Sequence, residues 1–278
     1  MEALSALTSS SQYVALEAFA NTYSAKLVCF GVLLSAFSVL YLYARLINKV
    51  SIVDPYWSLG FLLSAIVYYI HRDSQNGNQW RKDTTMLLTS LWAIRLAAYL
   101  FWRNWGHEDY RYAQFAKHYG KNWWWVSYFQ TFVLQGVLNW IIGHPLSGAI
   151  SGDAPASVLD FVGMAVWAVG FYFEAVGDFQ LAAFKSSPKN KGKLLTTGLW
   201  KYTRHPNYFG NAAMFWGFYL LSAGAGNYST IYSPILMTFL LLKVSGVALL
   251  ERGLRKTKPG FEAYMRNTSS FFPWFPTS

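Results

Sequence analysis

Charged residues are scarce in this sequence, and cysteine is nearly absent. Of the 278 residues, 13% are charged, whereas 54% are hydrophobic and 19% are aromatic. A soluble domain normally carries about 25% charged residues, so this balance indicates that lipid is the solvent for much of the chain. The single cysteine, Cys29, supports neither an internal disulfide framework nor a cysteine-rich metal cluster.

Several signatures of soluble cofactor-binding proteins are also missing. There is no Gly-x-Gly-x-x-Gly beside a strand, which excludes a Rossmann module, and no phosphate-binding P-loop. No pair of histidines has a spacing that suits a metal ion, so no metal site is expected. The net charge is +10, but long apolar, aromatic-rich runs make nucleic acid an improbable partner and the lipid bilayer the expected one.

Long apolar runs predict an all-α, polytopic membrane bundle of about seven transmembrane helices. The run from Leu27 to Ala44 contains no charge and is long enough to cross a bilayer, which takes roughly 20 residues at about 1.5 Å each. Charge and turn clusters divide the chain into seven candidate spans, at residues 27–44, 56–70, 84–102, 124–142, 158–184, 208–222 and 231–250. No long polar linker interrupts them, so residues 1–278 are predicted to form a single membrane-embedded domain.

Lysine and arginine are distributed unevenly between the connections. Of the 23, 17 follow the first, third, fifth and seventh candidate spans, and four lie in the segment through Lys26 and the remaining loops. Cytoplasmic loops carry the excess of basic residues, so the C-terminus is predicted to be cytosolic. Basic loops at a membrane also suit anionic lipids or a phosphorylated ligand.

Two acids lie inside the fifth candidate span. Glu174 and Asp178 are four residues apart, which places them on one face of a helix about one turn apart. Ionisable groups within a span usually face a polar interior or a site. The alternative is an ion pair with a neighbouring helix, for example with Arg95 or Lys243; the functional interpretation is preferred.

The loop before the sixth span collects polar side chains in a short stretch. It reads Lys-Tyr-Thr-Arg-His-Pro-Asn-Tyr at residues 201–208. Arg204 can hold a phosphate through two parallel hydrogen bonds, and Asn207 can recognise an amide or a ribose. His205 alone would be a satisfied loop histidine, but together with Tyr208 and its neighbours it favours a ligand site.

Other polar positions are open to two interpretations. Arg95 and Arg103 recur on one face of the third span, where they either bind a ligand or reach the interface as topology signals. Asp54 precedes a proline, a pattern that is equally typical of a helix start. Glu251 ends the seventh span, and the aromatic tail containing Tyr264 either anchors the bundle or closes over a ligand.

Several of these segments together resemble the steroid 5-alpha-reductase-like family of membrane enzymes, most closely its DUF1295 branch. The resemblance rests on five segments: Phe-Glu…Gly-Asp-Phe-Gln-Leu…Phe-Lys at 173–185, Gly-Leu-Trp-Lys-Tyr-Thr-Arg-His-Pro-Asn-Tyr-Phe-Gly at 198–210, Phe-Glu-Ala-Tyr…Phe-Pro at 261–273, Asp-Pro-Tyr-Trp at 54–57 and Glu-Asp-Tyr-Arg at 108–111. The loop motif is shared with sterol reductases and isoprenylcysteine methyltransferases.

The resemblance implies a reductase that uses NADPH to reduce a carbon–carbon double bond in a steroid- or lipid-like enone. The positions that it assigns to the cofactor site are Arg95, Arg103, Glu174, Asp178, Lys185, Asn207 and Asn211, and the loop and the C-terminal segment add Arg204, His205, Tyr208, Glu251 and Tyr264. The family's tyrosine before the third-helix arginine is replaced by Trp92, so Asp54, Tyr56 and Tyr110 are the candidate proton donors.

Two other functions remain open. Because the Arg-His-Pro-Asn-Tyr loop is shared across the superfamily, a methyltransferase using S-adenosylmethionine is the alternative, and a non-catalytic lipid-binding protein is a third. The resemblance and the lack of a recognisable targeting signal predict the endoplasmic reticulum. The sequence predicts a lipophilic small-molecule substrate but neither its identity nor the oligomeric state.

Overall fold

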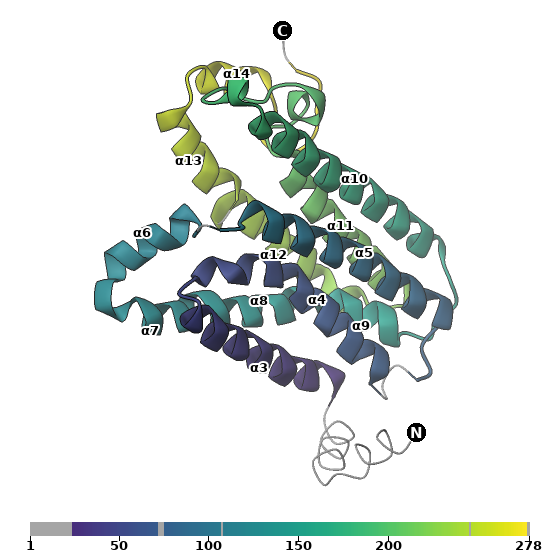
Figure 1. Ribbon diagram of the computed structural model, residues 1–278. Helices are drawn as coiled ribbons and strands as arrows, with labels where there is room; N and C mark the ends of the chain where they lie inside the picture. The colour runs from purple at the N-terminus through teal and green to yellow at the C-terminus, as the bar shows by residue number, and fades with distance from the viewer. Residues whose placement is uncertain (1–23, 72–74, 107, 245, 277–278) are drawn as a thin grey trace. The chain divides into compact units, whose positions relative to one another are not determined.

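The computed structural model describes residues 24–71, 75–106, 108–244 and 246–276, and these residues form helices and no strands. They divide into two compact units, residues 1–156 with 225–227 and residues 157–224 with 228–278. Each unit is described by itself below, and the predicted single domain stays a prediction. Figure 1 labels the helices of both units.

The first unit contains three long helices and several short ones. They are α3 (Ala25–Leu46), α4 (Val53–Ile70), α5 (Gln79–Arg103), α6 (Tyr110–Tyr119), α7 (Trp123–Ser127), α8 (Leu134–Ile142) and α9 (His144–Ser151). A π-helical stretch, Tyr128–Val133, joins α7 to α8. The side chain of Asn78 accepts a hydrogen bond from the backbone of Arg81 and so caps α5. Asp54 lies in the first turn of α4.

The second unit is built on one antiparallel pair of helices. Its elements are α10 (Val158–Ser186), α11 (Pro206–Gly224), α12 (Tyr232–Phe239), α13 (Val247–Thr257) and α14 (Phe261–Asn267). Ser157 and Asp160 form a capping box that begins α10. Pro206 is the first residue of α11, where the absence of a backbone N–H costs nothing.

Five helices of the described residues are long and apolar enough to cross a membrane: Ala25–Leu46, Val50–Ile70, Gln79–Arg103, Val158–Ser186 and Tyr228–Thr257. They correspond to the first, second, third, fifth and seventh predicted spans, and they support an integral membrane protein. The other two predicted spans are helical but not among the five. One is divided by the π-helical stretch, and α11 contains two asparagines and three glycines. The predicted number of about seven spans is therefore not confirmed.

α10 and α11 pack through glycines that recur every seven residues. They are Gly163, Gly170 and Gly177 on α10 and Gly210, Gly217 and Gly224 on α11. A Cβ placed on Gly210 would lie 2.4 Å from the backbone nitrogen of Glu174, and one on Gly163 would lie 2.9 Å from the carbonyl oxygen of Gly217. Small residues at such positions allow membrane helices to approach closely. This glycine seam fixes which polar residues of the two helices face each other.

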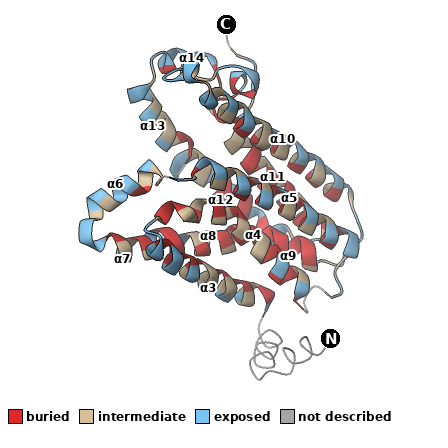
Figure 2. Ribbon diagram, viewed as in Figure 1, coloured by how far each residue is buried: buried red, intermediate tan, exposed pale blue. Residues whose placement is uncertain are grey.

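The face of α10 that carries the glycine seam is buried, whereas other faces of the long helices are exposed. Figure 2 shows exposed residues along α3 and α10, where large apolar side chains such as Val169, Tyr172 and Phe179 are exposed. A row of exposed apolar residues is what lipid contact requires. The buried residues of α10 include the glycines of the seam together with Glu174 and Asp178.

Candidate functional site

Two buried acids of α10 face two asparagines of α11 across the glycine seam. Asn211 donates from Nδ2 to Oε1 of Glu174 at 3.2 Å, and Asn207 donates from Nδ2 to Oδ1 of Asp178 at 3.1 Å. Glu174 and Asp178 are 3% and 4% exposed. Each acid thus has an asparagine amide among its hydrogen-bond partners, as buried polar groups require. The structure brings together four residues that the resemblance assigns to one cofactor site.

A second buried network connects the loop before α11 to α13. Arg204 donates from Nε to Oε1 of Glu251 at 2.8 Å, and Nε2 of His205 lies 3.2 Å from the same oxygen. Arg204 and His205 are 7% and 3% exposed. The ring of His205 also stacks on Tyr208, with centroids 5.6 Å apart and planes at 10°. One carboxylate therefore contacts both Arg204 and His205.

The same arginine holds the C-terminal segment. Its Nη1 donates to the carbonyl oxygens of Met265, at 3.1 Å, and Thr268. Nε donates to Glu251. The guanidinium has one edge that includes Nε and another that includes Nη1, so one donor on each edge is already engaged inside the protein. The phosphate fork predicted for Arg204 needs two donors on one edge. Arg204 thus acts in the structure as a link between the loop and the tail.

Backbone hydrogen bonds extend this link along the tail. The backbone nitrogen of Arg204 donates to Ser269 O, and that of Trp274 donates to Tyr202 O, both at 2.9 Å. The hydroxyl of Thr203 donates to Phe271 O at 2.9 Å. Residues 202–204 therefore pair with residues 269–274. The tail thus lies against the loop, and its closure over a ligand stays a prediction.

The loop is also fastened to α10. Trp200 donates from its indole nitrogen to the carbonyl oxygen of Gly177 at 3.1 Å, and the backbone nitrogen of Leu199 donates to Oε1 of Gln180 at 2.9 Å. Gly198 has φ +63°, a conformation that glycine adopts without strain. The turn at Gly198 and its two anchors set the position of the loop relative to the acids of α10.

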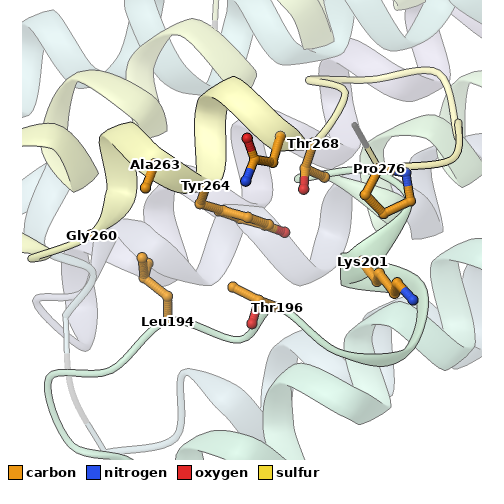
Figure 3. Close-up of a pocket in the computed structure, with 9 residues that line it drawn as sticks. Leu194, Thr196, Lys201, Gly260, Ala263, Tyr264, Thr268 and Pro276 are labelled. Atoms are coloured by element: carbon orange, nitrogen blue, oxygen red, sulfur yellow. The ribbon is translucent and has the colours of Figure 1, made fainter. Parts of the chain in front are cut away.

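A pocket of about 350 Å³ opens between this loop and α14. Its lining residues are Leu194, Thr196, Lys201, Gly260, Ala263, Tyr264, Asn267, Thr268 and Pro276. In Figure 3 the ring of Tyr264 lies across the space between Thr196 on the loop and Thr268 on the tail. The pocket is thus built from the two segments that Arg204 ties together.

Tyr264 connects the pocket to the buried network. Its hydroxyl donates to the carbonyl oxygen of Trp200. Burial raises the pKa of Tyr264 above its ordinary value, although Arg204 opposes the shift, so the phenol is protonated at neutral pH. Among the residues predicted from the sequence, Tyr264 is the one that lines this pocket. Lys201 and Asn267 were not predicted as site residues, because the sequence does not show that the loop and α14 meet around one pocket.

The first unit has a polar cluster of its own around Asp54. Tyr112 donates from its hydroxyl to Oδ1 at 2.7 Å, and Arg111 donates from Nη2 to Oδ2 at 2.8 Å. Burial, followed by the charge of Asp54, raises the pKa of Tyr112 well above its ordinary value. The cluster fastens α6 to the start of α4 through a carboxylate–phenol pair.

The tyrosine in this pair differs from the one predicted. Tyr110 is 56% exposed, whereas Tyr112 is 7% exposed; two residues apart, they lie on different faces of α6. The periodicity of α6 was the signal that could have selected Tyr112. Tyr56 packs its ring against Phe101 at 6.0 Å. Asp54 is the candidate proton donor that the structure places in a polar network.

The remaining predicted site residues are more dispersed. In the first unit, Arg95 is half-buried on α5, and Arg103 is exposed and donates to Asn104 Oδ1 at 3.1 Å. In the second unit, Lys185 is exposed near the end of α10. No group of three or more His, Cys, Asp or Glu side chains that could hold a metal ion is found within the described part of the chain. The predicted roles of these residues in cofactor binding stay predictions.

Comparison with known proteins yields a family and one distant relative. Residues 40–268 match the family described as "Protein of unknown function (DUF1295)". A "Probable O-methyltransferase ustE" from Ustilaginoidea virens is 30% identical over 132 residues, which is 48% of this chain and 42% of that protein. The match thus spans less than half of the relative's length. No solved structure is significantly similar to the chain.

Proposed function

The chain belongs to the DUF1295 family, and we propose that it is an integral-membrane enzyme that transfers a methyl group from S-adenosylmethionine to a lipophilic acceptor. The observation that carries the proposal is the engagement of Arg204 by Glu251 and by two carbonyl oxygens of the tail. The similarity to a protein described as a probable O-methyltransferase supports the same reaction.

Phosphate content separates the two cofactors considered for this site. NADPH carries three phosphate groups, and S-adenosylmethionine carries none. Arg204 is the buried cation of the loop, and Glu251 neutralises it at 2.8 Å. An arginine that lacks two free donors on one edge is a poor bidentate phosphate ligand. The donor set around Arg204 therefore suits the cofactor without phosphates.

The pocket beside Tyr264 suits the adenosine end of that cofactor. Its volume of about 350 Å³ is near the lower end of ligand pockets, which hold roughly 300–1,000 Å³. The aromatic face of Tyr264 would hold the adenine ring, Asn267 would recognise its polar edge, and Lys201 would pair with the carboxylate. When bound, the cofactor would supply an electrophilic methyl group: the oxygen of an acceptor hydroxyl would take it from the sulfonium sulfur, S-adenosylhomocysteine would leave, and the hydroxyl proton would pass to water.

Reduction by NADPH is the second candidate, and one observation favours it. Four exposed lysines follow α10 in the same unit, at Lys189, Lys191, Lys193 and Lys201. Lysines are phosphate ligands as point charges, so this segment is able to contribute to a phosphate-rich cofactor. The shared Arg-His-Pro-Asn-Tyr loop fits either reaction.

Label transfer tests the proposed reaction directly. Membranes containing the protein are incubated with S-adenosylmethionine that carries a deuterated methyl group, and extracted lipids are screened by mass spectrometry for the label. Methyl transfer predicts a labelled lipid that disappears with Tyr264→Ala and persists with Tyr228→Ala, which changes an exposed tyrosine outside the pocket. Labelling equal to that of control membranes, while NADPH is consumed in the same lipids, would overturn the proposal.

A further inference from the structure

The segment after α10 and the end of the chain form a basic, aromatic surface on the second unit. From Phe179 to Leu250 the sequence contains no aspartate or glutamate. Within this stretch Lys189, Lys191, Lys193 and Lys201 are all exposed. A run of one charge sign on an exposed segment generates a local positive potential that attracts anions.

Three aromatic side chains of the tail are exposed close to this segment, since Leu194, which follows Lys193, lines the same pocket as Pro276, which follows Phe275. Phe272, Trp274 and Phe275 are 66%, 72% and 77% exposed. The tail is held in place at this point, since the backbone nitrogen of Trp274 donates to Tyr202 O at 2.9 Å and the rings of Phe275 and Tyr202 lie 6.0 Å apart. Large aromatic groups gathered on an ordered surface mark an interaction site.

A chain of ring contacts places this surface beside an apolar helix. Phe272 packs against Phe209 with centroids 6.2 Å apart, and Phe209 packs against Phe173 at 5.1 Å. Phe173 belongs to α10, which is long and apolar enough to cross a membrane. Aromatic side chains gather where such a helix meets the headgroups, so the tail has the composition of an interfacial segment.

We propose that this surface binds anionic phospholipid headgroups. Lys189, Lys191 and Lys193 would contact lipid phosphates, while Phe272, Trp274 and Phe275 enter the boundary between headgroups and acyl chains. The aromatic side chains favour a membrane lipid over a soluble phosphate, because a soluble anion offers them no apolar partner. Each lysine near an anionic surface strengthens binding about fivefold. The inference is independent of the reaction that the enzyme catalyses.

Brominated lipids provide the test, because bromine quenches nearby tryptophan. The full-length protein is placed in bilayers containing either brominated phosphatidylserine or brominated phosphatidylcholine at equal bromine content. The chain has 13 tryptophans, so the signal of Trp274 is obtained as the difference between wild type and Trp274→Phe. We expect phosphatidylserine to quench this signal more strongly than phosphatidylcholine does.

Charge variants separate headgroup selection from simple contact. The triple variant Lys189→Gln, Lys191→Gln, Lys193→Gln is expected to lose the preference, by on the order of tenfold or more in relative lipid binding. The matched control is Lys117→Gln with Lys121→Gln, two exposed lysines of the first unit, which should leave it unchanged. Equal quenching by both lipids, or none by either, would overturn the proposal. The proposal would also be overturned if added inorganic phosphate abolished the preference for phosphatidylserine while chloride at equal ionic strength left it unchanged, because the surface would then bind free phosphate.

Discussion

Nε of Arg204 lies 2.8 Å from Oε1 of Glu251, and Nε2 of His205 lies 3.2 Å from the same oxygen. These contacts join the loop before α11 to α13. The other edge of Arg204 donates to the carbonyl oxygens of Met265 and Thr268. A single carboxylate therefore organises the loop and, through the arginine, the tail that forms one side of the pocket.

Removing that carboxylate's charge should loosen the C-terminal segment. Glu251→Gln leaves Arg204 buried without its counter-charge, and breaking one partner of a buried pair costs about 3 kcal/mol or more. We expect a lower unfolding temperature and faster proteolysis of residues 260–276 in detergent. Glu262→Gln is the control, because Glu262 is exposed and lies 3.7 Å from an exposed Arg255. A tail equally protected in Glu251→Gln and in wild type would contradict this role.

The glycine seam makes a second prediction. In Gly210→Ala the new methyl group would lie 2.4 Å from the backbone nitrogen of Glu174, so α10 and α11 must separate. Overpacking of this kind costs about 1–3 kcal/mol, and it would also stretch the hydrogen bond between Asn211 and Glu174. The measurement is the unfolding temperature in detergent.

Gly253→Ala is the matched control for that experiment. Gly253 is an exposed residue of α13 with no atom within 4 Å of the added Cβ, and alanine is a better helix former by about 1 kcal/mol. Its unfolding temperature should rise or stay the same. If Gly210→Ala behaved like Gly253→Ala, the close packing of α10 and α11 would be wrong.

Local patterns located the five long apolar helices and the polar residues within them. Glu174 and Asp178 were assigned to one face of a long helix because four residues make about one turn. The pairing of these acids with Asn207 and Asn211 was not predicted, since a contact between α10 and α11 depends on the register of the glycine seam. The engagement of Arg204 by two tail carbonyl oxygens could not be predicted either, because these contacts join residues 61 and 64 positions apart along the chain.

Asp54 is predicted to act mainly as a structural group of the first unit. Asp54→Asn removes the charge that pairs with Arg111 at 2.8 Å but keeps an oxygen for Tyr112. Hydrogen bonds to charged groups contribute about 1.5–3 kcal/mol, so the unfolding temperature should fall. Tyr112→Phe should lower it as well, and Tyr56→Phe should not. Unchanged stability with complete loss of activity would instead assign Asp54 to catalysis.

Asp109 makes stability depend on pH at the start of α6. Burial opposes its ionisation, but hydrogen bonds and charge from Arg111 outweigh burial and lower the pKa of Asp109. A carboxylate whose pKa is lowered by folding stabilises the folded state at any pH above its ordinary pKa. That stabilisation is lost as the pH falls through the lowered pKa of the folded state. Asp109→Asn keeps a helix-capping oxygen and removes the charge.

The comparison is therefore made across an acid series. The difference in unfolding temperature between wild type and Asp109→Asn should be largest near neutral pH and should vanish in strong acid. A difference that is constant with pH would show that the charge of Asp109 does not stabilise α6.

Cofactor binding by the purified protein in lipid nanodiscs tests the account most directly. Calorimetric titration with S-adenosylmethionine should show saturable binding that Tyr264→Ala abolishes, whereas NADPH at the same concentrations should show none, because Arg204 is held by Glu251. Saturable binding of NADPH together with no binding of S-adenosylmethionine would contradict the account.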